Sequence, residues 1–299
     1  MILVYCLYIE SEKGQQPMET VSQQITLTDG RRLAYDEYGD PDGRPIIFMH
    51  GFPGSRLDWR MFDSSAQEPN VRIIAVDRPG MGLSDFQRGR KLLDWPDDVI
   101  ELADALQLDR FSVLAISGGG PYGAVCAFKI PERLTATAIV CGMGPREAPG
   151  AEEGGSWTLP GKPALIRKVL LLLLAQTVQK QPERMEPQFL EILSEPDRAL
   201  LEEQPELLKM SIGSWQEAFH SGTGGVQHEA GLYKRPWEFR LQDIPAGVHL
   251  WHGENDNNVP VSVGRYVADA IPNCQATFVA GEGHFTLPYN HMREILCVL

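Results

Sequence analysis

The sequence predicts an α/β fold, in which helices cover both faces of a mainly parallel sheet. Three observations support this class. Apolar runs typical of strands alternate with amphipathic helical segments along most of the chain. Several of these runs are continuously apolar, as expected of strands that are covered on both faces. One long segment, residues 145–243, carries helix signals and no convincing strand.

The expected elements follow in a regular order. Residues 22–28 and 32–38 alternate around Asp29-Gly30, which is typical of a hairpin. Six further strands bring the sheet to eight and are expected at 46–49, 72–76, 111–116, 134–140, 248–251 and 276–280. Helices are expected between and after these strands, at 92–106, 121–129, 261–270 and 287–299.

Two parts of the chain stand outside this alternation. Residues 145–243 are interpreted as a helical cap inserted into a core domain made of residues 22–144 and 244–299. Residues 1–21 precede the first expected strand and are interpreted as a disordered N-terminal extension. Its apolar start, residues 1–9, lacks the basic region and the cleavage site of a signal peptide.

Composition and charge exclude several classes of partner. The chain has 299 residues, with 27 Lys and Arg against 40 Asp and Glu, which gives a net charge of −13 and no basic run. This balance disfavours nucleic acids and anionic membrane surfaces. The apolar run 169–175 is shorter than the roughly 20 residues that span a bilayer, so we interpret it as a buried helix. Five widely spaced cysteines without a CxxC pair favour a reducing, cytoplasmic compartment over a disulfide or zinc framework.

A sharp turn with a serine follows the strand at 111–116. Residues 115–121 read Ala-Ile-Ser-Gly-Gly-Gly-Pro and lie between that strand and the next helix. Such a turn needs small residues two positions either side of the serine, and Ala115 and Gly119 supply them. It would expose the Ser117 hydroxyl and direct the helix N-terminus, which stabilises negative charge, towards it. The pattern is that of a nucleophile elbow, with Ala115 where glycine is commoner.

A second interpretation of this turn is weaker. Gly118, Gly120 and Gly123 also match the GxGxxG pattern of dinucleotide-binding folds. Such folds place an acidic residue about 20 positions later, at the end of the next strand. That strand ends Val140-Cys141-Gly142, without an acid. A dinucleotide cofactor is therefore disfavoured, and a structural glycine turn with an incidental serine is the remaining alternative.

Three more motifs follow expected strands. His50-Gly51-Phe52-Pro53-Gly54 comes after 46–49, Asp256 lies in the turn after 248–251, and His284 lies in a Gly-Glu-Gly-His-Phe segment after 276–280. With the loop at 77–84, these segments resemble the α/β-hydrolase superfamily from about residue 22 to the C-terminus. The chain order Ser…Asp…His is also that of the superfamily, so the resemblance implies its fold.

The resemblance implies a role for each motif residue. Ser117 would be the nucleophile, His284 its base and Asp256 the acid that orients the histidine, while the backbone N–H groups of Phe52 and Gly118 would form the oxyanion hole. The chemistry supports these roles, because a serine hydroxyl needs a base and a buried carboxylate stabilises the imidazolium that forms.

Other polar residues have plainer interpretations. Glu254 lies two residues early in its turn, and Glu282 lies too close to His284 in sequence to face it easily, so both are weaker candidates for the acid. His50 and His252 are expected to be structural, and Arg56 and Arg78 to form ion pairs that fix loops. No metal ion is expected at this site.

The sequence therefore predicts a cofactor-free serine hydrolase that cleaves an ester or related acyl bond of a small, largely apolar substrate. The cap would contribute pocket wall and exclude water, with Trp215 and Trp237 as candidate substrate contacts. Proline iminopeptidases are the first alternative, although they usually show GGSWG at the elbow, and carbon–carbon bond hydrolases are the next. A small-molecule receptor or signalling protein on the same fold is the alternative from another class.

Overall fold

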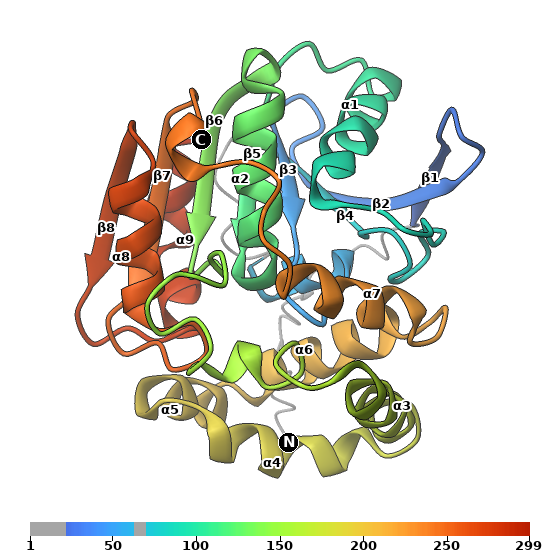
Figure 1. The fold of residues 1–299 in the computed structure, drawn as a ribbon, viewed down its shortest axis with the longest axis vertical. Helices are drawn as coiled ribbons and strands as arrows, with labels where there is room; N and C mark the ends of the chain where they lie inside the picture. Colours follow the sequence, from blue (N-terminus) through green and yellow to red (C-terminus); the bar gives the residue numbers. More distant parts are fainter. Residues whose placement is uncertain (1–21, 63–69) are drawn as a thin grey trace, which may run out of the picture.

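The computed structural model describes residues 22–62 and 70–299. The extension expected at residues 1–21 lies outside these ranges. Eight strands form a single sheet of order β1-β2-β4-β3-β5-β6-β7-β8, and β2 runs antiparallel to both of its neighbours while the other pairs are parallel (Figure 1). The predicted α/β class with an eight-stranded, mainly parallel sheet is confirmed. The strands are β1 (Gln23–Thr26), β2 (Arg32–Gly39), β3 (Arg44–Met49), β4 (Val71–Val76), β5 (Phe111–Ile116), β6 (Leu134–Val140), β7 (Val248–Gly253) and β8 (Cys274–Val279).

Helices cover both faces of the sheet, as the continuously apolar strands require. On one face α1 (Trp95–Ala105), α2 (Gly120–Lys129) and α8 (Val261–Ala270) share a buried apolar cluster with the sheet. On the other face the 3-10 segment η1 (Arg56–Phe62) and α9 (Thr286–Cys297) do the same. β5 lies between β3 and β6 and is buried along its whole length. A residue at its end therefore has a rigid support.

Five α-helices occupy the long segment between β6 and β7, in which no strand is assigned. They are α3 (Ala164–Lys180), α4 (Met185–Ile192), α5 (Glu195–Glu203), α6 (Pro205–Ala218) and α7 (Gly224–Tyr233). We call residues 145–243 the helical insertion. Figure 1 shows these helices gathered below the arrowheads of the parallel strands, at the carboxyl ends where the expected site residues lie.

The leucine run within α3 corrects one expectation. The run was expected to be buried, but Leu171 is buried while Leu172 and Leu173 are about half exposed. α3 packs on α6 and α7 on one side only, so its opposite side faces solvent. Among the described helices, none combines the length and the apolar character that crossing a membrane requires.

Candidate active site

The turn after β5 holds Ser117 in an uncommon backbone conformation. Its φ is 54°, in the left-handed region that residues other than glycine rarely adopt. Such strain costs of order 1–3 kcal/mol and persists where the surroundings impose it. Here β5 ends at Ile116 and α2 begins at Gly120, so the serine lies at the point where the chain reverses from strand to helix.

The glycines around this serine are explained by close packing. A methyl group added at Gly118 would lie 2.5 Å from Phe52 Cβ, and one at Gly120 would lie 2.8 Å from the Cα of Gly142. One at Gly123 would lie 2.7 Å from Ala115 Cβ. The GxGxxG spacing thus follows from the contacts that α2 makes with its neighbours, and it needs no dinucleotide to account for it.

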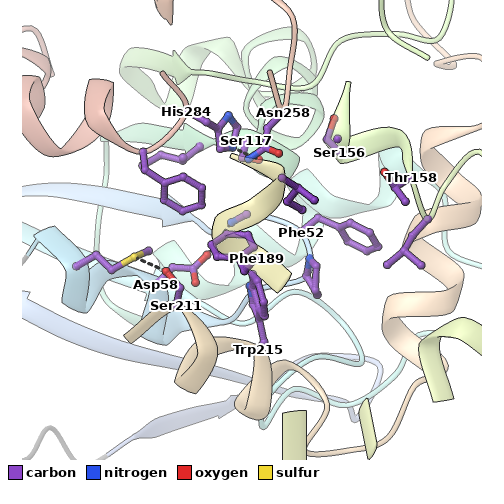
Figure 2. Close-up of a pocket in the computed structure, with 18 of the residues that line it drawn as sticks. Phe52, Asp58, Ser117, Ser156, Thr158, Phe189, Ser211, Trp215, Asn258 and His284 are labelled. Carbon is purple, nitrogen blue, oxygen red and sulfur yellow. Dashed lines mark hydrogen bonds between the residues drawn. The ribbon is translucent and has the colours of Figure 1, made fainter. Parts of the chain in front are cut away.

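Ser117, His284 and Asp256 form a continuous hydrogen-bonded chain. His284 Nε2 lies 2.9 Å from Ser117 Oγ, and His284 Nδ1 lies 2.8 Å from Asp256 Oδ2. The other oxygen of Asp256 accepts hydrogen bonds from the backbone N–H groups of Asn258 and Val259 at 2.9 and 2.8 Å. These bonds fix the carboxylate, which in turn orients the imidazole. Figure 2 shows His284 and Ser117 together at the cavity.

The structure separates Asp256 from the two other candidate acids. Glu254 is exposed and pairs with Arg265 at 2.7 Å. Glu282 accepts hydrogen bonds from the Asn290 side chain at 3.0 and 3.2 Å. Neither glutamate hydrogen-bonds to His284, so among these three acids the geometry joins only Asp256 to the histidine.

The environment of His284 favours its protonated form. Burial opposes the charge, but the negative charge of Asp256 and its hydrogen bond outweigh burial and raise the pKa of His284 above 6.5. Asp197 adds to this rise through its own charge. An imidazole with this surrounding can accept the hydroxyl proton and hold it beside a stabilising carboxylate.

Two backbone N–H groups lie beside the serine. A methyl group added at Gly118 would lie 3.0 Å from the Phe52 backbone nitrogen, so the loop after β3 approaches the elbow closely. Gly118 lies in the first turn before α2, where N–H groups have no partner within the helix. The structure therefore brings together the Phe52 and Gly118 backbone groups that the sequence suggested.

The helical insertion reaches the histidine loop through Asp197, which the sequence analysis missed. One carboxylate oxygen of Asp197 accepts a hydrogen bond from the His284 backbone N–H at 2.8 Å, and the other accepts from Phe285 and Thr286 at 2.8 and 2.9 Å. Asp197 is completely buried, and Ser194 donates a further bond to it at 2.7 Å. The insertion therefore does more than the expected formation of pocket wall and exclusion of water, because it also holds this loop.

A second buried network joins the insertion to the elbow. Tyr233, on α7, donates a hydrogen bond to the Gly118 carbonyl oxygen at 2.8 Å and contacts Glu229 at 2.7 Å. Glu229 pairs with Arg78 and Arg90, each at 2.7 Å, and all three side chains are buried. Arg78 thus forms the loop-fixing ion pair that was expected of it.

Arg56 and two histidines also behave as expected. Arg56 pairs with Asp77 on the core and Glu217 on the insertion, each at 2.7 Å, and with Asp36 at 3.0 Å. His50 accepts a hydrogen bond from the Arg78 backbone N–H at 3.2 Å, and His252 bonds the Val259 carbonyl oxygen at 2.8 Å. These groups support loops around the site and do not face Ser117.

A cavity of about 580 Å³ opens beside Ser117 and His284. Its wall is mainly apolar and comes from both the core and the insertion, with Phe52, Phe189 and Trp215 among its residues (Figure 2). Trp215 therefore lies where a substrate contact was expected. Trp237 does not line this cavity: it stacks on Phe239, with ring centroids 5.4 Å apart, so the expectation of a substrate contact is corrected for Trp237.

The thiol of Cys141 lies near Asp256 and His284. The Cys141 sulfur, Asp256 and His284 have atoms suited to metal ligation within 4.8 Å of one another. Burial raises the pKa of the Cys141 thiol well above 9.0, which disfavours the thiolate that metals bind. Asp256 and His284 are also already bonded to each other, so this donor set suits proton transfer better than metal binding.

Comparisons with known proteins identify relatives of this chain. The sequence profile described as "Alpha/beta hydrolase family" matches residues 46–296. A non-heme chloroperoxidase of Streptomyces lividans is 32% identical over 40% of this chain and 45% of its own length. A proline iminopeptidase of Xylella fastidiosa is 30% identical over 37% of this chain and 36% of its own length. The matched regions thus span less than half of these curated relatives.

Solved structures share the fold over most of the chain. An esterase from a Rhodococcus species superposes with a TM-score of 0.68 at 21% identity, covering 92% of this chain and 97% of the esterase. A thermophilic esterase from Thermogutta terrifontis gives a TM-score of 0.66 at 21% identity, covering 93% and 98%. At this level of identity the likeness shows the fold alone.

Proposed function

The chain belongs to the alpha/beta hydrolase family, and from this premise we propose that it is a serine hydrolase that cleaves an ester or related acyl bond. The observation that carries the proposal is the chain of hydrogen bonds from Ser117 through His284 to Asp256, beside a largely apolar cavity. Ser117 is the nucleophile, His284 the base and Asp256 the orienting acid. The cavity wall favours small, largely apolar substrates, because burial of apolar surface contributes roughly 25 cal/mol per Å².

Acylation begins when Ser117 Oγ attacks the acyl carbon and passes its proton to His284 Nε2. The negative charge that forms on the carbonyl oxygen accepts hydrogen bonds from the Phe52 and Gly118 backbone N–H groups. Each such donor contributes about 3 kcal/mol to catalysis in comparable enzymes. The bond to the leaving oxygen then breaks, His284 protonates that oxygen, and an acyl-enzyme remains on Ser117.

Deacylation repeats these steps with water. A water molecule attacks the acyl carbon while His284 takes its proton, and the bond to Ser117 Oγ breaks as His284 returns a proton to the serine. Apart from the substrate and water, every reacting group in this proposed cycle belongs to the protein, and the proposal includes no cofactor. The helical insertion acts as the cap, because its residues form part of the cavity wall and so reduce the access of bulk water to the reacting groups.

The proposal is tested with a fluorophosphonate probe and matched serine variants. The probe should label one serine per chain, lose that label in Ser117→Ala and keep it in Ser156→Ala, since Ser156 lines the same cavity. Ser117→Ala should also lower kcat on simple esters by about 10³-fold or more, because the three residues act as a unit. Labelling that persists in Ser117→Ala would refute the assignment. A labelled Ser117 without turnover of any ester, but with tight binding of a small molecule, would favour the receptor alternative.

A further inference from the structure

A second carboxylate lies in the wall of the same cavity. Asp58, on η1, is only 8% exposed and lines the cavity together with mainly apolar side chains (Figure 2). Its Oδ2 atom accepts a hydrogen bond from the Gly51 backbone N–H at 2.9 Å. Gly51 directly precedes Phe52, so this carboxylate lies next to the proposed oxyanion loop.

Asp58 and Ser117 border a common space. A methyl group placed on Gly51 would have three nearest atoms: Asp58 Oδ2 at 3.5 Å, Ser117 Cβ at 3.7 Å and Ser117 Oγ at 4.0 Å. All three are ordinary contact distances without overlap. The same point on Gly51 is therefore within 4.0 Å of both the carboxylate and the nucleophile, so the two groups lie close together on the cavity wall, where one substrate could contact both.

The charge of Arg78 acts on the carboxylate of Asp58, but the two groups do not form an ion pair. Among residues 22–62 and 70–299, no ion pair includes Asp58, whereas the buried acids Asp77 and Glu229 are paired with arginines. Burial raises the pKa of Asp58 to about 6, against hydrogen bonds from Ser214 and Gly51 and the charge of Arg78, which lower it. Two donors also leave part of its acceptor capacity unused, since a carboxylate accepts about four hydrogen bonds.

A role in fixing the loop does not explain this charge. The Gly51 N–H needs only an acceptor oxygen, which an uncharged asparagine would also supply. A buried carboxylate is costly unless it is paired. A buried carboxylate at the edge of the cavity, without a directly bonded cation, is therefore better explained by a donor group that a substrate brings to it.

We propose that Asp58 is a specificity residue that accepts a hydrogen bond from a hydroxyl or ammonium group of the substrate. This inference rests on the proposed acyl hydrolysis at Ser117. Because Asp58 lies so close to the nucleophile, the donor belongs on the acyl group, two or three bonds from the reacting carbonyl carbon. The substrate class is thus an ester of a short acid that carries a hydroxyl or amino group near its carboxyl end.

The test compares four methyl esters that differ only in this group: butanoate, 2-hydroxybutanoate, 3-hydroxybutanoate and 3-aminobutanoate. For at least one donor-bearing ester, kcat/KM should exceed that of butanoate by about tenfold or more, the scale of a hydrogen bond to a charged group. The ester with the largest ratio identifies the donor as hydroxyl or ammonium. The ratio should fall to about one or below in Asp58→Asn, which keeps an acceptor for Gly51.

Two controls separate recognition from folding. Asp109→Asn changes an exposed carboxylate just before β5, at the far end of the strand that carries Ser117, and should leave the ratio unchanged. Rates are expressed per fluorophosphonate-reactive site, so misfolded protein does not enter the ratio. Equal kcat/KM for all four esters, or a donor preference that survives Asp58→Asn, would overturn the inference. In either event, labelling of Ser117 and hydrolysis of butanoate would leave the serine hydrolase proposal standing, whereas its own failure would appear as absent labelling.

Discussion

The carboxylate of Asp197 holds the backbone of His284 from 87 residues away in the sequence, through a hydrogen bond of 2.8 Å. One residue belongs to the helical insertion and the other to the loop between β8 and α9. The same carboxylate accepts two further backbone N–H groups at the start of α9. The proposed base therefore takes its position from both parts of the molecule, and this has a measurable consequence.

Asp197→Asn should lower kcat/KM by about tenfold and should also shift its pH dependence. The amide places an N–H group against backbone donors, and leaving such groups unpaired costs about 1–3 kcal/mol. Because the charge of Asp197 helps to raise the pKa of His284, its removal should lower that pKa. The acidic limb of the kcat/KM profile should then move to lower pH, which a profile from pH 5 to 9 measures.

Asp98→Asn is the matched control for this change. Asp98 is also buried, but it pairs with Arg31 at 2.6 Å, on α1 and away from the cavity. Its loss should reduce stability without moving the acidic limb. If both variants left the limb where it is in the parent, Asp197 would be a structural residue only.

The acid of the proposed triad is tested by comparing amide variants. Asp256→Asn should lower kcat by about 10³- to 10⁴-fold, because an amide favours the wrong histidine tautomer and cannot stabilise the imidazolium. Glu254→Gln and Glu282→Gln should change kcat by less than about twofold, since neither side chain bonds to His284. Steady-state rates on one ester decide the matter, and a larger loss in Glu254→Gln would contradict the assignment.

The pH profile of the parent should show one rising limb. Ser117 needs neutral His284 as its base, so activity is lost when the imidazole is protonated. Burial alone would lower the histidine pKa, but Asp256 outweighs it, and the pKa lies above 6.5. On the butanoate ester, kcat/KM should therefore rise with pH through a value above 6.5 and then level off. A flat profile between pH 5 and 8 would exclude His284 as the base.

Trp215 should influence the choice of acyl length. Trp215→Ala enlarges the cavity, so kcat/KM should shift towards longer acyl chains, by up to about fourfold for each added methylene that becomes buried. Trp237→Ala is the control, because Trp237 stacks on Phe239 outside the cavity wall. An ester panel of graded acyl length provides the measurement. The same change of ranking in both variants would show that it does not arise from the cavity wall.

The buried network around Glu229 should dominate stability against acid. Burial opposes its charge, but Arg78 and Arg90 lower the pKa of Glu229 to about 2. A lowered folded-state pKa stabilises the protein above the unfolded value of about 4.5, and this contribution is lost as the pH falls from there towards 2. Glu229→Gln should cost about 3–5 kcal/mol at pH 7, because it leaves buried arginines uncompensated.

Urea unfolding at pH 7 and pH 3 measures this contribution. Glu238→Gln is the control, since exposed Glu238 pairs with Lys91 at the surface, where solvent screens ion pairs. The difference between Glu229→Gln and the parent should shrink at pH 3. An equally small effect of both variants at pH 7 would contradict the role of the network.

Local patterns were sufficient to predict the sheet. Each expected strand is found, with its ends displaced by at most two residues, because apolar runs and turn residues report directly on burial and chain reversal. The helix expected from residue 92 begins as a 3-10 turn, and α1 starts at Trp95 with Pro96 in its first turn. The burial of the α3 leucines could not be predicted, since it depends on which neighbours lie beside the helix.

The site was predictable where a residue follows a strand end. Ser117, Asp256 and His284 each lie after a strand, and parallel strands bring such ends to one edge of the sheet. Asp58 and Asp197 carry no comparable signal, because a single aspartate in a helical segment is usually solvated. Their burial depends on how the insertion packs on the core. Tertiary packing also explains why Trp237 does not line the cavity.

The crowding of the elbow glycines determines how this site can change. Gly118 meets the Phe52 loop, Gly120 meets the chain after β6, and Gly123 meets β5. An alanine at each position would push on a different neighbour, so the three variants should fail in distinct ways: a displaced oxyanion donor, a shifted segment after β6, or a separated helix and strand. The serine cannot move independently of these three neighbours, and variation in substrate preference is therefore expected to accumulate in the helical insertion, where residues such as Trp215 can change without disturbing the elbow.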